Sequence, residues 1–101
     1  MYARITSAQI ALDKIDRFKK IYEESVVPAA RKQKGFKGIC LMVDPKTGEG
    51  ISMTFWESEQ DALANEKNLY YQQQVAKFIP FYKRQPIREG FEVLFEYGVR
   101  H

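Results

Sequence analysis

Two alternating stretches, Phe36–Asp44 and Gly50–Glu57, flank the segment "PKTGE" and constrain the fold most strongly. Proline and glycine are common turn residues, so the pattern predicts a β-hairpin. One face of the expected hairpin is strongly apolar, made of Ile39, Leu41, Val43, Ile51, Met53 and Phe55. Keeping these residues on one side requires Leu41 opposite Met53, because a one-residue slip inverts a strand. We therefore expect an odd-numbered connection, Pro45–Glu49, with Gly48 at positive φ.

The segment before the hairpin reads as a strand followed by a helix. Tyr2–Gln9 alternates as a strand does, and Asp13 is a candidate N-cap. Apolar residues then recur at spacings of three and four, at Ile15, Phe18, Tyr22, Val26 and Ala29. Pro28 lacks a backbone donor, so we expect the helix to bend around residues 24–28. Gly35 is the expected stop.

After the hairpin, Ser58 with Asp61 three residues later predicts a second helix over Glu59–Glu66. Asn68 is the expected cap of a third helix, which runs to Pro80. The last strand is predicted over Gly90–Tyr97. The order βαββα(α)β is typical of the α+β class, with a four-stranded antiparallel sheet and helices on one side, the ferredoxin-like βαββαβ arrangement.

Both faces of the predicted central strands carry large apolar side chains, although two helices cover only one face of a sheet. An apolar face left in water would be a large patch for a monomer. The sequence therefore predicts a homodimer with two-fold symmetry, packed sheet to sheet. We expect residues 1–101 to form a single domain.

Composition argues against several classes of partner. The net charge is +3 and most charges alternate in sign, as in "DKIDRFKKIYEE", so we expect no nucleic-acid binding. No stretch approaches the ~20 apolar residues of a membrane span, and the N-terminal residues do not resemble a signal peptide. The single cysteine, Cys40, fits a reducing compartment, and its position favours a packed strand residue over a nucleophile. A cytoplasmic protein is expected.

The segment "GFKGICLMVDPKTGEGISMTFWESEQDALANE", followed by "YYQQQVAKFIPF", resembles the antibiotic biosynthesis monooxygenase (ABM) superfamily. The resemblance rests on the Gly-Phe pair that begins the second strand and on the Trp-x-Ser turn after the third, and it spans residues 2–97. It implies a dimeric α/β barrel. The superfamily includes cofactor-free monooxygenases acting on aromatic polyketides or quinols, haem-degrading enzymes, and many small proteins with no known reaction.

The haem-degrading branch carries an asparagine in its first strand, a tryptophan in the helix after the third strand, and an axial histidine in the next helix. None of these stands at the matching places, Tyr2–Gln9, Glu59–Glu66 and Asn68–Pro80. The only histidine is His101, which we expect to be a terminal residue rather than a ligand. One histidine and one cysteine far apart suggest no metal site. We therefore expect no cofactor.

The resemblance implies a cofactor-independent monooxygenase for a small aromatic or quinol-type compound. The alternative is a non-catalytic small-molecule-binding or stress-associated dimeric module. Side chains that would line the pocket, if they face inward, are Trp56, Asn65, Tyr22, Tyr70, Tyr71 and Arg4. For the tyrosines a core or rim position is the competing interpretation. For Trp56 we favour a structural role between the sheet and the second helix over a wall of the pocket.

Overall fold

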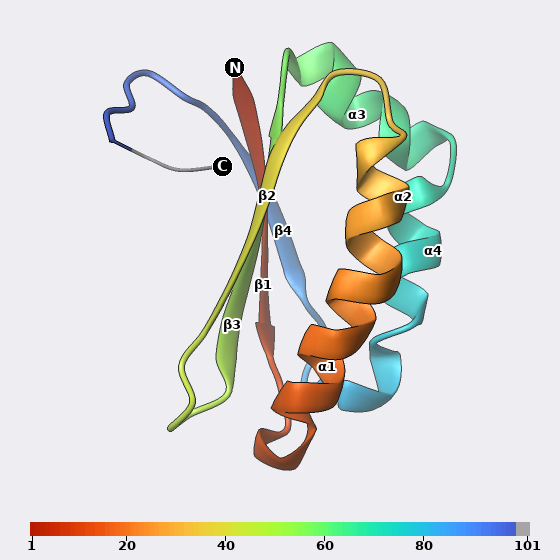
Figure 1. Cartoon of the computed structure of the whole chain (residues 1–101), viewed down its shortest axis with the longest axis vertical. Coiled ribbons are helices and arrows are strands. Elements are labelled where there is room, and N and C mark those ends of the chain that lie inside the picture. Colours follow the sequence, from red (N-terminus) through yellow and green to blue (C-terminus); the bar gives the residue numbers. More distant parts are fainter. Residues whose placement is uncertain (99–101) are drawn as a thin grey trace.

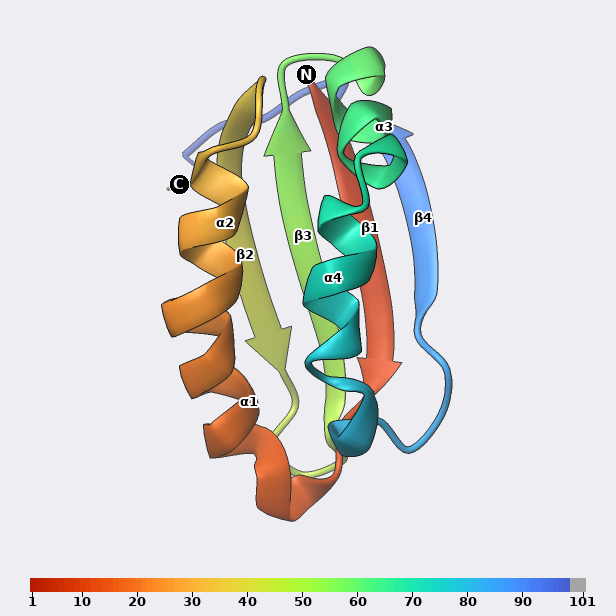
Figure 2. The same cartoon turned by 90° about the vertical axis from the view of Figure 1, so that its right-hand side faces the viewer.

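The computed structural model describes residues 1–98 (Figure 1). Four antiparallel strands form one sheet in the order β2-β3-β1-β4, and the helices cover one face of it (Figures 1 and 2). The elements are β1 (Tyr2–Gln9), α1 (Ile15–Ile21), α2 (Val27–Arg31), β2 (Phe36–Val43), β3 (Glu49–Trp56), α3 (Glu59–Lys67), α4 (Tyr70–Ala76) and β4 (Ile87–Glu92). The α+β, ferredoxin-like prediction is confirmed.

The first helical segment begins and bends differently from a plain α-helix. A 3₁₀ turn, Leu12–Lys14, precedes α1, and the predicted cap Asp13 is wrong, because Ala11 takes that position without a side-chain bond. Between α1 and α2 the chain is π-helical over Tyr22–Val26, and the N–H of Val27 donates to the carbonyl of Tyr22. This wider turn falls where Pro28 predicted an irregularity, since proline cannot continue the α-helical bonding.

The helix ends at Arg31, and Gly35 then turns the chain toward β2. Gly35 has a φ of +82°, which favours glycine because other side chains are strained there. A Cβ at this position would also lie 2.6 Å from the Cβ of Asp61 on α3. The predicted role of Gly35 as the turn after the helix is confirmed.

The hairpin register differs from the prediction. Leu41 lies opposite Ser52, and Met53 lies opposite Cys40, so Leu41 and Met53 are on opposite faces. The N–H of Asp44 donates to the carbonyl of Glu49 at 2.8 Å, which leaves the even-numbered connection 45–48 between them. The predicted pairing and the odd-numbered connection are therefore wrong, whereas Gly48 has the expected positive φ of +81°.

A bulge at Lys37 and internal hydrogen bonds explain the register. Phe36 pairs with Trp56 but Gly38 pairs with Phe55, so the ladder shifts by one residue between them. The helix-facing side of β2 and β3 then carries Ile39, Leu41, Val43, Ser52, Thr54 and Trp56. The prediction assumed that the apolar residues of both strands share one face of the sheet. Polar residues are nevertheless tolerated on the covered face when their hydroxyls are hydrogen-bonded. Ile51, Met53 and Phe55 consequently lie on the uncovered face.

Two apolar clusters fill opposite ends of the layer between sheet and helices. The larger joins the end of β1 to the helices and contains Ile10, Phe18, Tyr22, Val26, Phe78 and Phe81. The rings of Phe18 and Phe78 stack with centroids 4.2 Å apart. The smaller cluster contains Tyr2, Trp56 and Ala62 with Phe36 against it. Polar side chains occupy the middle of the layer, between these clusters.

The helices after β3 follow the sequence signals closely. The Oγ of Ser58 accepts from the N–H of Asp61 at 3.1 Å, which confirms the predicted cap. Asn68 accepts from the N–H of Tyr70 at 3.0 Å, although Leu69, at a φ of +68°, is the residue that precedes α4. The third helix ends at Ala76 rather than at Pro80, which lies in a 3₁₀ turn, Ile79–Phe81.

The last strand is shifted toward the N-terminus relative to its prediction. β4 pairs with β1 from Ile87 opposite Ser7 to Glu92 opposite Tyr2, so the predicted strand Gly90–Tyr97 is wrong beyond Glu92. Residues 93–98 leave the sheet on the side away from the helices (Figure 1). Three of their side chains are almost fully exposed, namely Leu94, Phe95 and Tyr97.

Candidate functional site

The middle of the helix-covered sheet face is polar. The ladder places Arg4 and Thr6 of β1 beside Ser52 and Thr54 of β3 and beside Arg88 of β4. The opposite face of the same strands carries Ala3, Ile5, Ile51, Met53, Phe55, Ile87 and Phe91. A covered face is ordinarily the apolar one. This inverted arrangement marks the interior as the candidate site.

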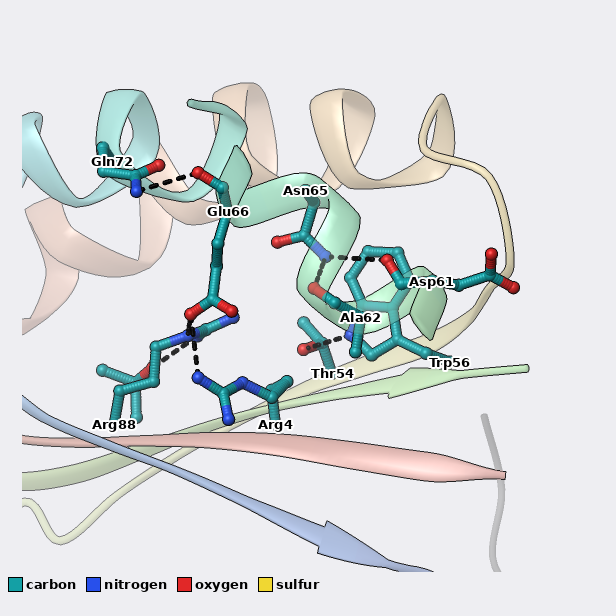
Figure 3. A network of polar contacts seen from close by, with 10 residues as sticks. Arg4, Thr54, Trp56, Asp61, Ala62, Asn65, Glu66, Gln72 and Arg88 are labelled. Atoms are coloured by element: carbon teal, nitrogen blue, oxygen red, sulfur yellow. Dashed lines mark hydrogen bonds and ion pairs between the residues drawn. The ribbon is translucent and has the colours of Figure 1, made fainter. Parts of the chain in front are cut away.

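Glu66 of α3 joins two strands through one carboxylate oxygen (Figure 3). Its Oε1 accepts from Nη2 of Arg4 and from Nε of Arg88, each at 2.8 Å. Arg88 also donates from Nη1 to the Oγ1 of Thr6 at 3.0 Å. Two guanidinium groups share one carboxylate, so the Arg4–Glu66–Arg88 cluster carries an excess of one positive charge.

Tyr71 of α4 packs against Arg88, one of the two arginines of this cluster. The guanidinium carbon of Arg88 lies 3.7 Å from the centre of the Tyr71 ring, a cation–π contact. Burial lowers the pKa of Arg88, and the hydrogen bond that Arg88 donates to Glu66 opposes that shift. The neighbouring Tyr70 is also largely buried, and burial raises its pKa to about 12. Tyr70 is therefore a neutral hydrogen-bond donor at neutral pH, not a base.

Asn65 is held inside α3 and is 2% exposed. Its Nδ2 donates to the carbonyls of Ala62 and Asp61, while its Oδ1 has no hydrogen-bond partner among the described residues. The Nε of Arg4 is buried and equally unpartnered within residues 1–98. Figure 3 shows the Asn65 amide pointing from α3 toward the sheet, with its oxygen turned to the Glu66 side. Within residues 1–98 the interior thus contains one buried acceptor and one buried donor without a protein partner.

Trp56 lies under α3 and is completely buried. Its indole N–H donates to the Oγ1 of Thr54 at 2.9 Å, and its ring meets Phe36 edge-on, with centroids 5.8 Å apart. Because its side chain is fully buried and its single polar atom is bonded within the chain, Trp56 has the character of a core residue. The predicted burial between sheet and helix is confirmed.

Tyr22 belongs to the larger apolar cluster. Its hydroxyl lies 2.6 Å from the Oγ of Ser52, and burial raises its pKa. The structure therefore joins Arg4 and Tyr71 through Glu66 and Arg88, while Asn65 and Tyr70 are the sequence neighbours of Glu66 on α3 and of Tyr71 on α4. Trp56 and Tyr22 lie in the apolar clusters on either side.

Glu66, Arg88 and Thr6 were missed by the sequence reasoning. Glu66 was assigned only to a helix end, and Arg88 to a loop, because the last strand was expected to begin at Gly90. Extending that strand backward would have placed Arg88 and Gly90 on one face. Gly90 is itself part of the arrangement, since a Cβ there would lie 2.6 Å from Nη1 of Arg4.

Within residues 1–98, no group of three His, Cys, Asp or Glu side chains is placed to hold a metal ion. His101, the one histidine weighed as a ligand, lies outside the described residues. No helix of the described chain has the length and apolar character needed to span a bilayer.

The strand order and the one-sided helix layer define a ferredoxin-like α+β protein with a polar interior between sheet and helices. The sequence profile described as antibiotic biosynthesis monooxygenase matches residues 1–77, and the chain belongs to this family. No curated protein matches the chain in sequence.

Three solved structures illustrate the likeness of fold. SnoaB from Streptomyces nogalater, a cofactor-independent oxygenase, is 8% identical with a TM-score of 0.76, over 97% of each chain. The monooxygenase ActVA-Orf6 of Streptomyces coelicolor, in complex with nanaomycin D, is 11% identical with a TM-score of 0.75, over 98% of this chain and 92% of that one. The haem degrader MhuD from Mycobacterium tuberculosis, with two haems bound, is 18% identical with a TM-score of 0.74, over 97% and 100%.

Proposed function

We propose that this protein is a cofactor-independent monooxygenase that acts on a small aromatic or quinol-type compound. The observation that carries the proposal is the pair of unpartnered buried groups, Oδ1 of Asn65 and Nε of Arg4, beside a cluster with excess positive charge. A phenolic substrate presents an O–H donor for the first group and an oxygen acceptor for the second. Its aromatic body would lie between the sheet and α3 and α4.

The charge of the cluster suits the chemistry of this reaction class. An electron-rich phenol or anthrone must lose a proton before it reacts with O2, which leaves an anion. Excess positive charge from Arg4 and Arg88 stabilises an anion in a site with little water. For an anthrone the reaction balances when the ring CH2 and O2 give a ring C=O and water. For 1,4-dihydroxynaphthalene it balances when the quinol and O2 give the hydroxyquinone and water, and in both cases the substrate supplies all the electrons. Glu66 Oε1 is shared by both arginines, so the proposal assigns no side-chain base and the proton is released to the bulk solvent.

Oxygen uptake tests the proposal. Wild-type protein is incubated aerobically with anthrone and 1,4-dihydroxynaphthalene, and O2 consumption is followed beside product absorbance. Asn65→Ala is expected to lower turnover about 10-fold or more, because it removes the amide oxygen that meets the substrate. Gln73→Ala is the control, since this amide side chain is exposed on α4. Equal turnover in the two variants would contradict the proposed role of Asn65.

A non-catalytic, small-molecule-binding or stress-associated module is the second candidate. It is favoured by the absence of a free base in the cluster, where the Glu66 Oε1 is already shared between Arg4 and Arg88. Calorimetric binding of the same aromatic compounds, with no O2 uptake above the rate without protein, would support this candidate instead.

The proposal includes a homodimer formed through the uncovered sheet face. Helices cover only one face of the sheet (Figure 1). On the uncovered face, the side chains of Met42, Ile87 and Phe91 remain exposed. The exposed apolar side chains of residues 93–98 extend the same surface. A second copy would bury this area, as domains of this size benefit from added burial. We also propose that residues 1–101 form one domain, and that the protein resides in the cytoplasm, where a free thiol such as Cys40 persists.

A further inference from the structure

A groove of about 520 Å³ is lined by Tyr71, whose ring also contacts Arg88, but not by the residues of the Arg4–Glu66–Arg88 cluster themselves. One wall is formed by Tyr71 and Val75 of α4 together with Ile79 of the following 3₁₀ turn. The other is formed by the connection from Tyr82 to Pro86, which bows away from α4 before β4 begins (Figure 2). Its size is that of a small-molecule site.

The connection that forms the outer wall is anchored to the sheet. The N–H of Lys83 donates to the carbonyl of Gln9 at 2.7 Å, and Tyr82 forms an isolated β-bridge with Ile10. Tyr82 is half-buried, whereas Ile79 is 63% exposed. The groove is therefore held open by backbone bonds at its base, while apolar surface faces the solvent inside it.

The charges at the groove all have one sign. Lys83 and Arg84 both line it, and no acidic side chain does. Neither residue forms an ion pair with any part of the described chain, unlike Arg4, Lys19, Lys37 and Arg88. Two unpaired cations beside apolar and aromatic walls match a molecule with one anionic end and one planar apolar end.

We propose that this groove is a binding site for an aromatic carboxylate, separate from the Arg4–Glu66–Arg88 cluster. The carboxylate pairs with Lys83 and Arg84, and the ring system lies against Tyr71, Val75 and Ile79. Because the proposal concerns binding alone, it stands whether or not the protein is an oxygenase.

The test uses the full chain and 2-naphthoate as probe, with affinity measured by calorimetry. The neutral amide of the same ring system, 2-naphthamide, is expected to bind at least about 10-fold more weakly, and added NaCl is expected to weaken only the naphthoate. The double variant Lys83→Gln/Arg84→Gln is expected to lose about 10-fold or more in naphthoate affinity. Arg31→Gln/Lys32→Gln is the matched control, because it removes two adjacent exposed cations at the end of α2 and changes net charge equally.

A second variant tests the apolar wall. Ile79→Asp places a negative charge in the groove at an exposed position, so the fold should survive, as thermal unfolding would verify, while naphthoate binding is abolished. Amide shifts in NMR spectra should map the probe to residues 79–86. Equal losses in the two double variants, equal binding of amide and carboxylate, or shifts confined to Arg4, Asn65 and Glu66 would each overturn the proposal.

Discussion

The hydroxyl of Tyr22, on the π-helical turn, lies 2.6 Å from the Oγ of Ser52 on the inner face of β3. This contact joins the π-helical turn between α1 and α2 to β3. The register of β3 places Ser52 on the helix-covered face, opposite to the prediction. Each hydroxyl is the other's hydrogen-bond partner, and Tyr22 is 6% exposed. The pair explains how a serine can stand where the sequence predicted an apolar core.

Removing both members of this pair should cost less than the sum of removing each alone. We expect Ser52→Ala to lower the free energy of unfolding by about 1–3 kcal/mol, because it leaves a buried phenol without a partner. The double variant Tyr22→Phe/Ser52→Ala should be less destabilised than the sum of the single variants. Urea unfolding of all four proteins measures the coupling, and additive single effects would mean that the contact contributes nothing.

Trp56→Ala should affect stability before it affects binding. A buried aromatic ring truncated to alanine typically loses ~3–5 kcal/mol through lost transfer energy and the cavity left behind. Trp56 is completely buried, and its N–H is already bonded to Thr54. Thermal unfolding and naphthoate or anthrone binding should be compared with those of Trp56→Phe, which keeps an aromatic ring. A variant with wild-type stability and lost binding would make Trp56 a site residue.

Sedimentation equilibrium at micromolar concentration should give twice the chain mass of 11.8 kDa. Phe91→Glu, on the uncovered sheet face, should shift the protein to the monomer because it buries a charge at the proposed interface. Leu63→Glu is the control, an exposed leucine on α3 in the helix layer. A wild-type mass of one chain would remove the basis of the dimer.

Stability should fall at alkaline pH. Burial raises the pKa of Tyr70 and of Tyr82 from the usual 10.0 to about 12, so the unfolded chain releases these protons first. The stabilising effect is complete below pH 10 and is lost as pH rises through about 12. Urea unfolding at several pH values should show this decline. Tyr82→Phe should make it shallower, and an unchanged slope in that variant would contradict the assignment.

Haemin should not form an axially ligated complex with this protein. The structural likeness to MhuD extends to the fold, but residues 68–80 contain no histidine. We expect titration with haemin to give no sharp Soret band of the kind that histidine ligation produces. A stable one-to-one complex that is lost on changing a single side chain would refute this expectation.

Most of the helices, strands and turns could be predicted from the sequence because their signals are local. The Ser58 cap, the turn at Gly48 and the irregularity near Pro28 depend on neighbouring residues, and each was predicted. The hairpin register could not be predicted in the same way, because the Lys37 bulge and the hydroxyl pairs of Ser52 and Thr54 depend on contacts made only after folding.

The candidate site was predictable only in part, for a related reason. Arg4, Asn65 and Tyr71 were recognisable as polar or aromatic side chains that could face inward. The connection of Arg4 and Tyr71 through Glu66 and Arg88 depends on how β4 aligns with β1, two strands that are far apart in the sequence. No local pattern in the sequence specifies that alignment.

The bulge at Lys37 lets Phe36 and Ile39 lie on the same side of the sheet, although residues on one side of a regular strand are separated by even intervals. Deleting Lys37 would remove the extra residue and leave Phe36 opposite Trp56, so the edge-on aromatic contact would be kept. Deleting Lys37 and Gly38 together would instead turn Phe36 to the uncovered side and remove that contact from Trp56. The number of residues between Phe36 and Ile39 therefore decides whether an aromatic ring lies inside or outside, whereas substitutions of Lys37, which is exposed, should be tolerated.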